Sequence, residues 1–228
     1  MTDKGMAKLN KPLKIVILAV TKTYDRYCIA GMTEHGQWIR PLPPDHCFWA
    51  SYKYDDGTFI KPGDIWKVTN YVKYNDPTSP GHTEDIRVLS YSSVCKCGEL
   101  NNAELCAFVK QHLESEQTLH DTLNANGRSL CLIKVDDIRK IDGENRVCFT
   151  MHGREYRNNT SKEGYPVTDL KWRSIFRSHR SISFKGFQNL YLCIGLARTE
   201  PNKHITREYP MVISMITNPF VDYPPQYP

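Results

Sequence analysis

Residues 14–44, KIVILAVTKTYDRYCIAGMTEHGQWIRPLPP, decide the fold. The stretch opens with a continuous apolar run, residues 14–21, which has the length and composition of a buried strand. Two more strand-like runs, residues 27–32 and 37–42, flank a short turn in which Gly36 supplies a positive φ. A pair of prolines then ends the last run. The stretch therefore predicts a buried strand followed by a β-hairpin.

The rest of the first half continues this strand pattern. Residues 65–74 alternate with period two, which predicts one long, half-exposed strand. A turn rich in Pro, Ser and Gly covers residues 76–81, and residues 85–94 form a further strand. Five strands with tight turns in about 80 residues are typical of a small closed barrel.

A helical segment separates this strand set from a second one. It begins at Asn101, a good N-cap, and ends at Asn126 and Gly127. After it, the pattern predicts strands over 130–135, 146–151, 154–157, 190–197 and 209–217, with a helix over 167–176. We expect a mainly β fold of two small barrels joined by a helical segment. The expected parts are a flexible N-terminus (1–12), a first barrel (13–98), a helical connector (99–127), a second barrel (128–218) and a Pro-rich tail (219–228).

Composition narrows the function classes. The 228 residues contain no stretch near the roughly 20 apolar residues of a membrane helix. The first apolar run is too short, and starts too far along the chain, for a signal peptide. The eight cysteines, several inside apolar strands, are then expected to be free thiols. These features predict a cytoplasmic protein with no membrane partner.

Positive charge is concentrated between Arg146 and Lys185. This segment has nine basic and three acidic residues, an excess of +6, whereas the whole chain carries +5. A local basic cluster is typical of a protein that contacts a phosphate backbone, and a solvated basic face is the alternative.

Two tryptophan–arginine pairs are the best candidates for contacts with bases and phosphates. Trp38 and Arg40 lie two apart on a strand and share one face, where they could stack a base and neutralise a phosphate. Trp172 and Arg173 follow Asp169. We expect Asp169 to cap a helix and not to act as a catalytic acid. The full set of predicted nucleic-acid-binding residues is Lys22, Arg26, Trp38, Arg40, Tyr71, Arg154, Arg157, Trp172, Arg173, Arg177 and Arg180.

Signatures of enzymes and metal sites are absent from the sequence. It contains no phosphate-binding glycine loop, no dinucleotide fingerprint, no zinc-protease motif and no nucleophile elbow. Cys95 and Cys97 have the spacing CxC, and no second ligand pair is spaced for zinc. We therefore predict no catalytic residue, no cofactor and no metal.

Four short motifs, in order along the chain, resemble the dual OB-containing domain family of bacterial and phage-conflict proteins. The resemblance spans residues 14 to about 217 and implies two OB-like barrels with a nucleic-acid or nucleotide-binding role. It implies no catalytic residues, and it is weak over residues 76–127. The motifs are residues 15–20 with 27–31, WIRP at 38–41, Tyr156 with 167–169 and 172–173, and LYLCIGL at 190–196.

The favoured function is binding of single-stranded DNA or RNA through aromatic stacking and Arg/Lys contacts to phosphates. One alternative is a sensor that holds a nucleotide or modified base in a pocket. Another is a protein-interaction module that uses the Pro-rich tail for docking.

Overall fold

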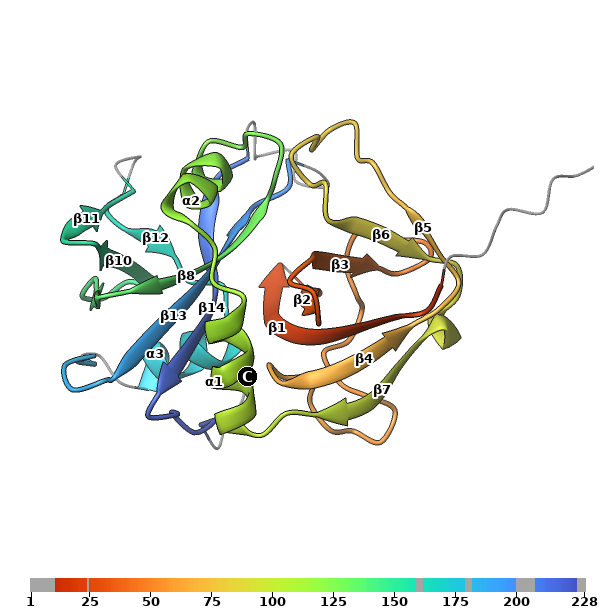
Figure 1. Cartoon of the computed structure of the whole chain (residues 1–228), viewed down its shortest axis with the longest axis horizontal. Coiled ribbons are helices and arrows are strands. Elements are labelled where there is room, and N and C mark those ends of the chain that lie inside the picture. Colours follow the sequence, from red (N-terminus) through yellow and green to blue (C-terminus); the bar gives the residue numbers. More distant parts are fainter. Residues whose placement is uncertain (1–10, 24, 159–161, 179–181, 200–207, 225–228) are drawn as a thin grey trace, which may run out of the picture.

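The computed structural model describes residues 11–23, 25–158, 162–178, 182–199 and 208–224. Within these residues the protein is mainly β, with two OB-like barrels joined by a helical segment, as the sequence predicts (Figure 1). The first ten residues of the expected flexible N-terminus and the last four of the Pro-rich tail lie outside the described ranges.

The first barrel is one curled sheet of seven strands. β3 and β6 pair in parallel, and all other neighbours pair antiparallel. β1 and β2 approach closely at Gly31, where a Cβ atom would lie 2.2 Å from the carbonyl oxygen of Val16. In spatial order the strands are β5 (Tyr71–Lys73), β6 (Asp85–Val88), β3 (Trp38–Leu42), β2 (Arg26–Thr33), β1 (Leu13–Thr23), β4 (Asp64–Val68) and β7 (Val94–Glu99).

The second barrel contains two smaller sheets. A three-stranded sheet lies against the first barrel, and a four-stranded sheet lies on its far side (Figure 1). The three-stranded sheet has the order β14 (Pro210–Asn218), β13 (Asn189–Leu196) and β8 (Leu130–Val135). The other contains β9 (Asp137–Lys140), β10 (Arg146–Met151), β11 (Arg154–Tyr156) and β12 (Tyr165–Pro166).

Strand β1 is buried on both faces, which explains its continuous apolar sequence. Ile15 and Ile17 point into the core of the first barrel. Val16 and Leu18 point the other way, into a core that they share with Leu132 and other residues of the three-stranded sheet. The second barrel thus packs directly onto the strand that opens the first.

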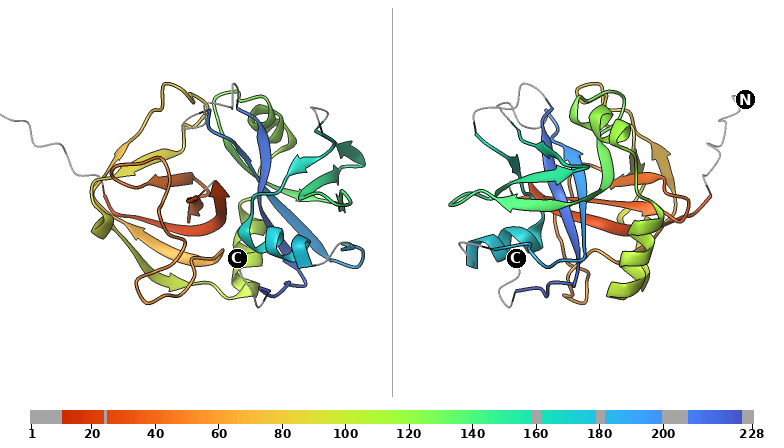
Figure 2. Two further views of the ribbon diagram at one scale, coloured as in Figure 1. Left: turned by 180° about the vertical axis from the view of Figure 1, so that it is seen from behind. Right: turned by 60° about the vertical axis from the view of Figure 1, so that its left-hand side comes forward.

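Three α-helices complete the described fold. α1 (Asn102–Gln111) begins with a capping box in which the Asn101 side chain accepts hydrogen bonds from the backbone of Ala103 and Glu104. α2 (Glu116–Leu123) begins at Ser115, and α3 (Leu170–Ser178) lies on the opposite face of the molecule (Figure 2). None of these helices is long and apolar enough to cross a membrane.

Several expected elements differ in detail. The single strand expected over 65–74 is divided between β4 and β5, because Asn70 adopts a φ of 43°. The strand expected over 85–94 is interrupted by the 3-10 turn Tyr91–Ser93. The helical stretch after Asn101 forms two helices, since Ser115 caps a second one. The expected turn at His152 and Gly153 is present, with positive φ at both residues.

Candidate ligand site between the two barrels

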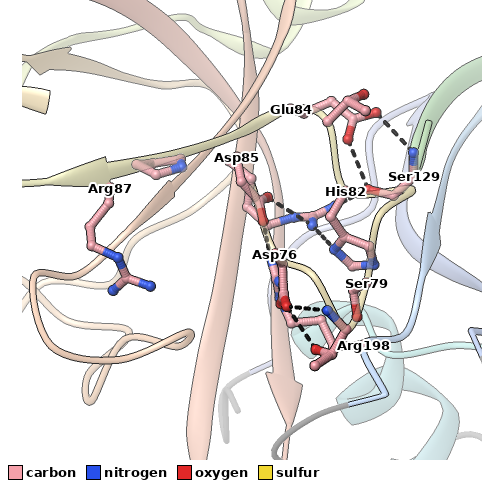
Figure 3. Close-up of polar contacts among 12 residues, drawn as sticks. Asp76, Ser79, His82, Glu84, Asp85, Arg87, Ser129 and Arg198 are labelled. Carbon is pink, nitrogen blue, oxygen red and sulfur yellow. Dashed lines mark hydrogen bonds and ion pairs between the residues drawn. The ribbon is translucent and has the colours of Figure 1, made fainter. Parts of the chain in front are cut away.

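A buried polar cluster joins the two barrels (Figure 3). At its centre is Asp85, the first residue of β6, whose side chain is fully buried. Its Oδ1 accepts a hydrogen bond of 3.0 Å from Arg40 Nη1, and its Oδ2 accepts one from Arg198 Nη2. Arg40 lies on β3 of the first barrel, whereas Arg198 follows β13 of the second. One carboxylate therefore bridges a guanidinium from each barrel.

The local fold sets this geometry. The parallel register of β3 and β6 places Arg40 opposite Asp85. In the loop before β6, Asp76 accepts hydrogen bonds from the backbone N and hydroxyl of Thr78, at 3.0 and 2.7 Å, and it also pairs with Arg198. Although burial opposes its ionisation, the Thr78 hydrogen bonds and the Arg198 charge hold the pKa of Asp76 below its ordinary value.

A third carboxylate also reaches from the first barrel to the second. Glu84 accepts hydrogen bonds from the backbone N and hydroxyl of Ser129, both at 2.9 Å, and from the backbone N of Leu130 at 3.2 Å. Arg40 Nη2 donates to the same Ser129 hydroxyl at 2.6 Å. These bonds fix the start of β8 against the first barrel.

His82 completes the cluster. Its Nδ1 lies against Arg40 Nη1, and because an arginine can only donate, this nitrogen is the acceptor. Its Nε2 lies 3.2 Å from Glu208 Oε1. Burial, and then the charges of Arg40 and Arg198, lower the pKa of His82 far below its ordinary value. The imidazole is therefore neutral at pH 7.

This burial makes stability depend on pH. Because the folded protein keeps His82 neutral while the unfolded chain titrates near pH 6.5, His82 favours folding above that pH, and its contribution is lost as the pH falls. We expect the free energy of unfolding to fall below pH 6.5, with a His82 share of at most about 1.4 kcal/mol per pH unit. Urea unfolding between pH 7 and pH 5 measures this slope.

Two variants separate the contribution of His82 to this pH dependence from that of other groups. His82→Gln should flatten the slope, whereas His35→Gln, at a side chain that is 85% exposed, should leave it unchanged. Equal slopes in the wild type and His82→Gln would contradict the assignment.

A pocket of about 310 Å³ opens beside the cluster. The first barrel contributes lining residues from β1, β2 and β3, and the second contributes the end of β13 and the start of β14. Among the described lining residues, three are cationic, namely Lys22, Arg40 and Arg198, and none is acidic. The carboxylates that pair with Arg40 and Arg198 are not among these lining residues.

The structure brings two of the predicted binding residues together at this pocket, Lys22 and Arg40. Lys22 is exposed, but Arg40 is only 2% exposed and holds the two barrels together. The expectation that Arg40 contacts phosphates on an open surface is therefore wrong. Its side chain is buried in the wall of the pocket.

The predicted stacking tryptophans are core residues. Trp38 is 5% exposed and donates its indole N–H to Glu114 Oε2 at 2.8 Å. Trp172 has no exposed surface and donates to the carbonyl oxygen of Met215 at 2.6 Å. This burial corrects the expectation for both rings, since neither has a face open to a base. Tyr71 is half-buried, and its hydroxyl donates to the carbonyl oxygen of Lys11 at 3.1 Å.

Much of the basic cluster at 146–185 is engaged within the protein. Arg146 donates to backbone carbonyls such as that of Glu163, at 2.8 Å, and Arg157 pairs with Glu155. Lys162 pairs with Glu144 at 2.7 Å. These contacts leave the segment less basic toward solvent than its composition indicates.

The other described members of the cluster lie on α3 and β11, apart from Lys185, which lies in a turn after α3. Lys171 is buried, with Nζ 3.6 Å from the ring centre of Phe220 in the C-terminal segment. Arg154 and Arg177 are exposed, and Arg173 is half-buried. Arg180 lies outside the described residues, and none of the three described arginines lines the pocket.

Sequence reasoning missed Arg198, His82 and Asp85. Arg198 follows an apolar strand by two residues, and the other two lie near a Pro-rich turn. No local motif marks them, because their meeting depends on how the barrels pack.

Asp169 is a helix cap, as predicted. Its Oδ1 accepts from the backbone N of Trp172 at 3.0 Å, and its Oδ2 accepts from the backbone N of Met215 at 3.1 Å. Burial raises the pKa of this carboxyl to about 6.

Comparison with known proteins identifies one family model. The model of the dual OB-containing domain matches residues 13–213. No curated protein matches the chain.

Several solved structures are similar over most of their length at low sequence identity. The tetrameric p202 HIN2 shares 14% identity, with 95% of this chain and 98% of that chain covered and a TM-score of 0.37. The Ifi202 HINa domain in complex with 20bp dsDNA shares 13% identity, with coverage of 90% and 92% and a TM-score of 0.32. A murine DNA binding protein bound with dsDNA shares 12% identity, with coverage of 94% and 98% and a TM-score of 0.33.

Proposed function

We propose that this chain, which belongs to the dual OB-containing domain family, binds nucleic acid. OB-folds are a general scaffold for binding oligonucleotides. The observation that carries the proposal is the basic pocket at the junction, where Lys22, Arg40 and Arg198 meet without an acidic residue among the described lining. A partner that reached this pocket would contact both barrels at once.

The proposed partner is single-stranded DNA or RNA. Exposed or half-buried basic residues from both barrels would contact its phosphates, since a cationic groove that follows the backbone is typical of single-strand binding. The proposed stacking contact with a base is Tyr71, because the predicted tryptophans are buried. The proposed phosphate contacts are Lys22, Arg26, Arg154, Arg157, Arg173 and Arg177.

Fluorescence anisotropy with labelled single- and double-stranded DNA and RNA tests this proposal. With the six proposed phosphate contacts, raising the salt from about 50 mM to about 200 mM should weaken binding to a single strand by about 300-fold. Arg177→Ala, at an exposed position in the last turn of α3, should weaken binding to every sequence and reduce the salt slope by about one.

Lys67→Ala is the matched control, because Lys67 is an exposed basic residue on β4 that is not among the proposed contacts. A flat salt response, or no binding to any oligonucleotide at low salt, would refute nucleic-acid binding.

A second candidate function, the sensing of a free nucleotide, is favoured by the size of the pocket. Its volume of about 310 Å³ lies at the lower end of the range for small-molecule sites. A free nucleotide could therefore occupy the pocket without being part of a nucleic-acid strand.

We further propose that the protein acts in the cytoplasm, in a bacterial or phage conflict system. The family resemblance implies that context, and eight free cysteines favour a reducing compartment.

A further inference from the structure

We propose that the pocket between the barrels binds one nucleoside phosphate, with the phosphate near Lys22 and the base against the apolar wall. The inference rests on the proposed function and deepens it by naming the chemical unit that the pocket takes. That unit has two sources, a free mononucleotide and the terminal nucleotide of a strand.

The charges of the lining select an anionic ligand. Lys22 is exposed at the pocket, and Arg40 and Arg198 form part of its wall. His82, which also lines the pocket, is neutral, because burial and the two arginines lower its pKa. No carboxylate is among the described lining residues. Asp85 and Asp76 offset the charges of Arg40 and Arg198, so the attraction for an anion comes chiefly from Lys22.

The two arginines also retain unused donors. Their Nη atoms are held by Asp85, Asp76 and Ser129, which fixes both guanidinium planes. In the described part of the chain, however, the buried Nε atoms of Arg40 and Arg198 have no hydrogen-bond partner. A buried donor without a partner is destabilising, so an acceptor oxygen that reached it would be bound favourably.

The remaining lining selects a ligand that is more than an anion. Phe48, Leu130, Met211 and Ile213 give the pocket an apolar wall, and Tyr209 adds a second aromatic ring to the lining. Inorganic phosphate would leave this wall uncovered, whereas a planar base would cover it and could contact the ring of Phe48. Three threonines at the pocket add hydroxyl groups for the polar edge of a base or the hydroxyls of a sugar. They are Thr21, Thr23 and Thr168.

The size of the pocket limits the ligand to one such unit. About 310 Å³ is close to the smallest volume of ordinary ligand sites, so a dinucleotide would extend into solvent. Because the walls come from both barrels, the bound nucleotide would also hold the barrels together and stabilise the folded chain.

Thermal shift with the full chain is the first test. The probes are the common ribonucleoside and deoxyribonucleoside monophosphates, the matching nucleosides and inorganic phosphate, each at about 1 mM. At least one monophosphate should raise Tm by about 2 °C or more. The matching nucleoside should raise it less, and inorganic phosphate should have little effect. An equal shift with inorganic phosphate alone would overturn the assignment to a nucleotide.

Two lysine variants localise the binding. Lys22→Ala should weaken the affinity for the monophosphate at least about tenfold. Lys67→Ala removes the same charge from an exposed position on β4, away from the pocket, and should leave the affinity unchanged. Equal affinities in the two variants would place the ligand elsewhere and overturn the inference.

Competition against a labelled oligonucleotide separates the two sources. If the monophosphate displaces the oligonucleotide, a strand terminus occupies the pocket. If both bind without competition, the pocket takes a free nucleotide. Oligonucleotide binding without any monophosphate response would overturn this inference and leave the proposed function standing, whereas binding of neither would overturn both.

Discussion

Replacement of Asp85 by alanine should lower the free energy of unfolding by about 3–5 kcal/mol, the usual effect of removing one partner from a buried ion pair. Asp85 is fully buried and pairs with two arginines, Arg40 and Arg198. Without it, and counting partners among the described residues, the Arg40 side chain keeps its bonds to Ser129 and His82, and the Arg198 side chain keeps Asp76. Both guanidiniums would then be buried with less charge compensation.

Urea unfolding at pH 7 measures this loss, with Asp137→Ala as the control. Asp137 is an exposed residue of β9, and its replacement should change stability by no more than about 0.5 kcal/mol. Asp85→Asn should lie between the wild type and Asp85→Ala, because the amide keeps the shape and loses the charge. A loss below about 1 kcal/mol for Asp85→Ala would show that Asp85 is not central to the junction.

Replacement of Trp172 by alanine should cost about 3–5 kcal/mol, as is typical for a buried aromatic residue. The ring has no exposed surface and lies 5.4 Å, centre to centre, from Phe184 and 5.9 Å from Phe176. Its removal leaves a cavity in the second barrel and leaves the carbonyl oxygen of Met215 without its indole donor.

This variant also separates a structural role from a binding role. Leu89→Ala is the control, since Leu89 is 58% exposed and its truncation should change stability by no more than about 0.5 kcal/mol. If Trp172→Ala weakens nucleic-acid binding, the weakening should track the unfolded fraction and disappear at low temperature, where the folded state is restored. A binding loss with unchanged stability would show that the ring is accessible to a base.

Local sequence pattern was sufficient for most of the strands. Those over 14–21, 130–135, 190–197 and 209–217 were predictable because a strand buried on one or both faces is marked by its own apolar residues. The break between β4 and β5 was not, because it depends on one residue, Asn70, in a left-handed conformation. The parallel pairing of β3 with β6 was also hidden, since the choice of partner strand is not local.

The candidate site was predictable only in part. Lys22 and Arg40 were found because each lies two residues from an aromatic residue, a pattern that is visible within one segment of the sequence. Arg198 and His82 contribute only after two distant segments meet. The tryptophans misled for a related reason, because the residue type alone does not distinguish a ring that stacks on a base from one that fills a core.

The position of β1 has a consequence for how the molecule can be divided. Alternate side chains of this one strand complete two different cores, so the wall that β1 forms belongs to both barrels. A cut in the helical connector would separate the chain into sequence halves but would strip an apolar face from each. The two OB-like barrels are therefore one cooperative unit, and a hinge between them would have to open a packed core.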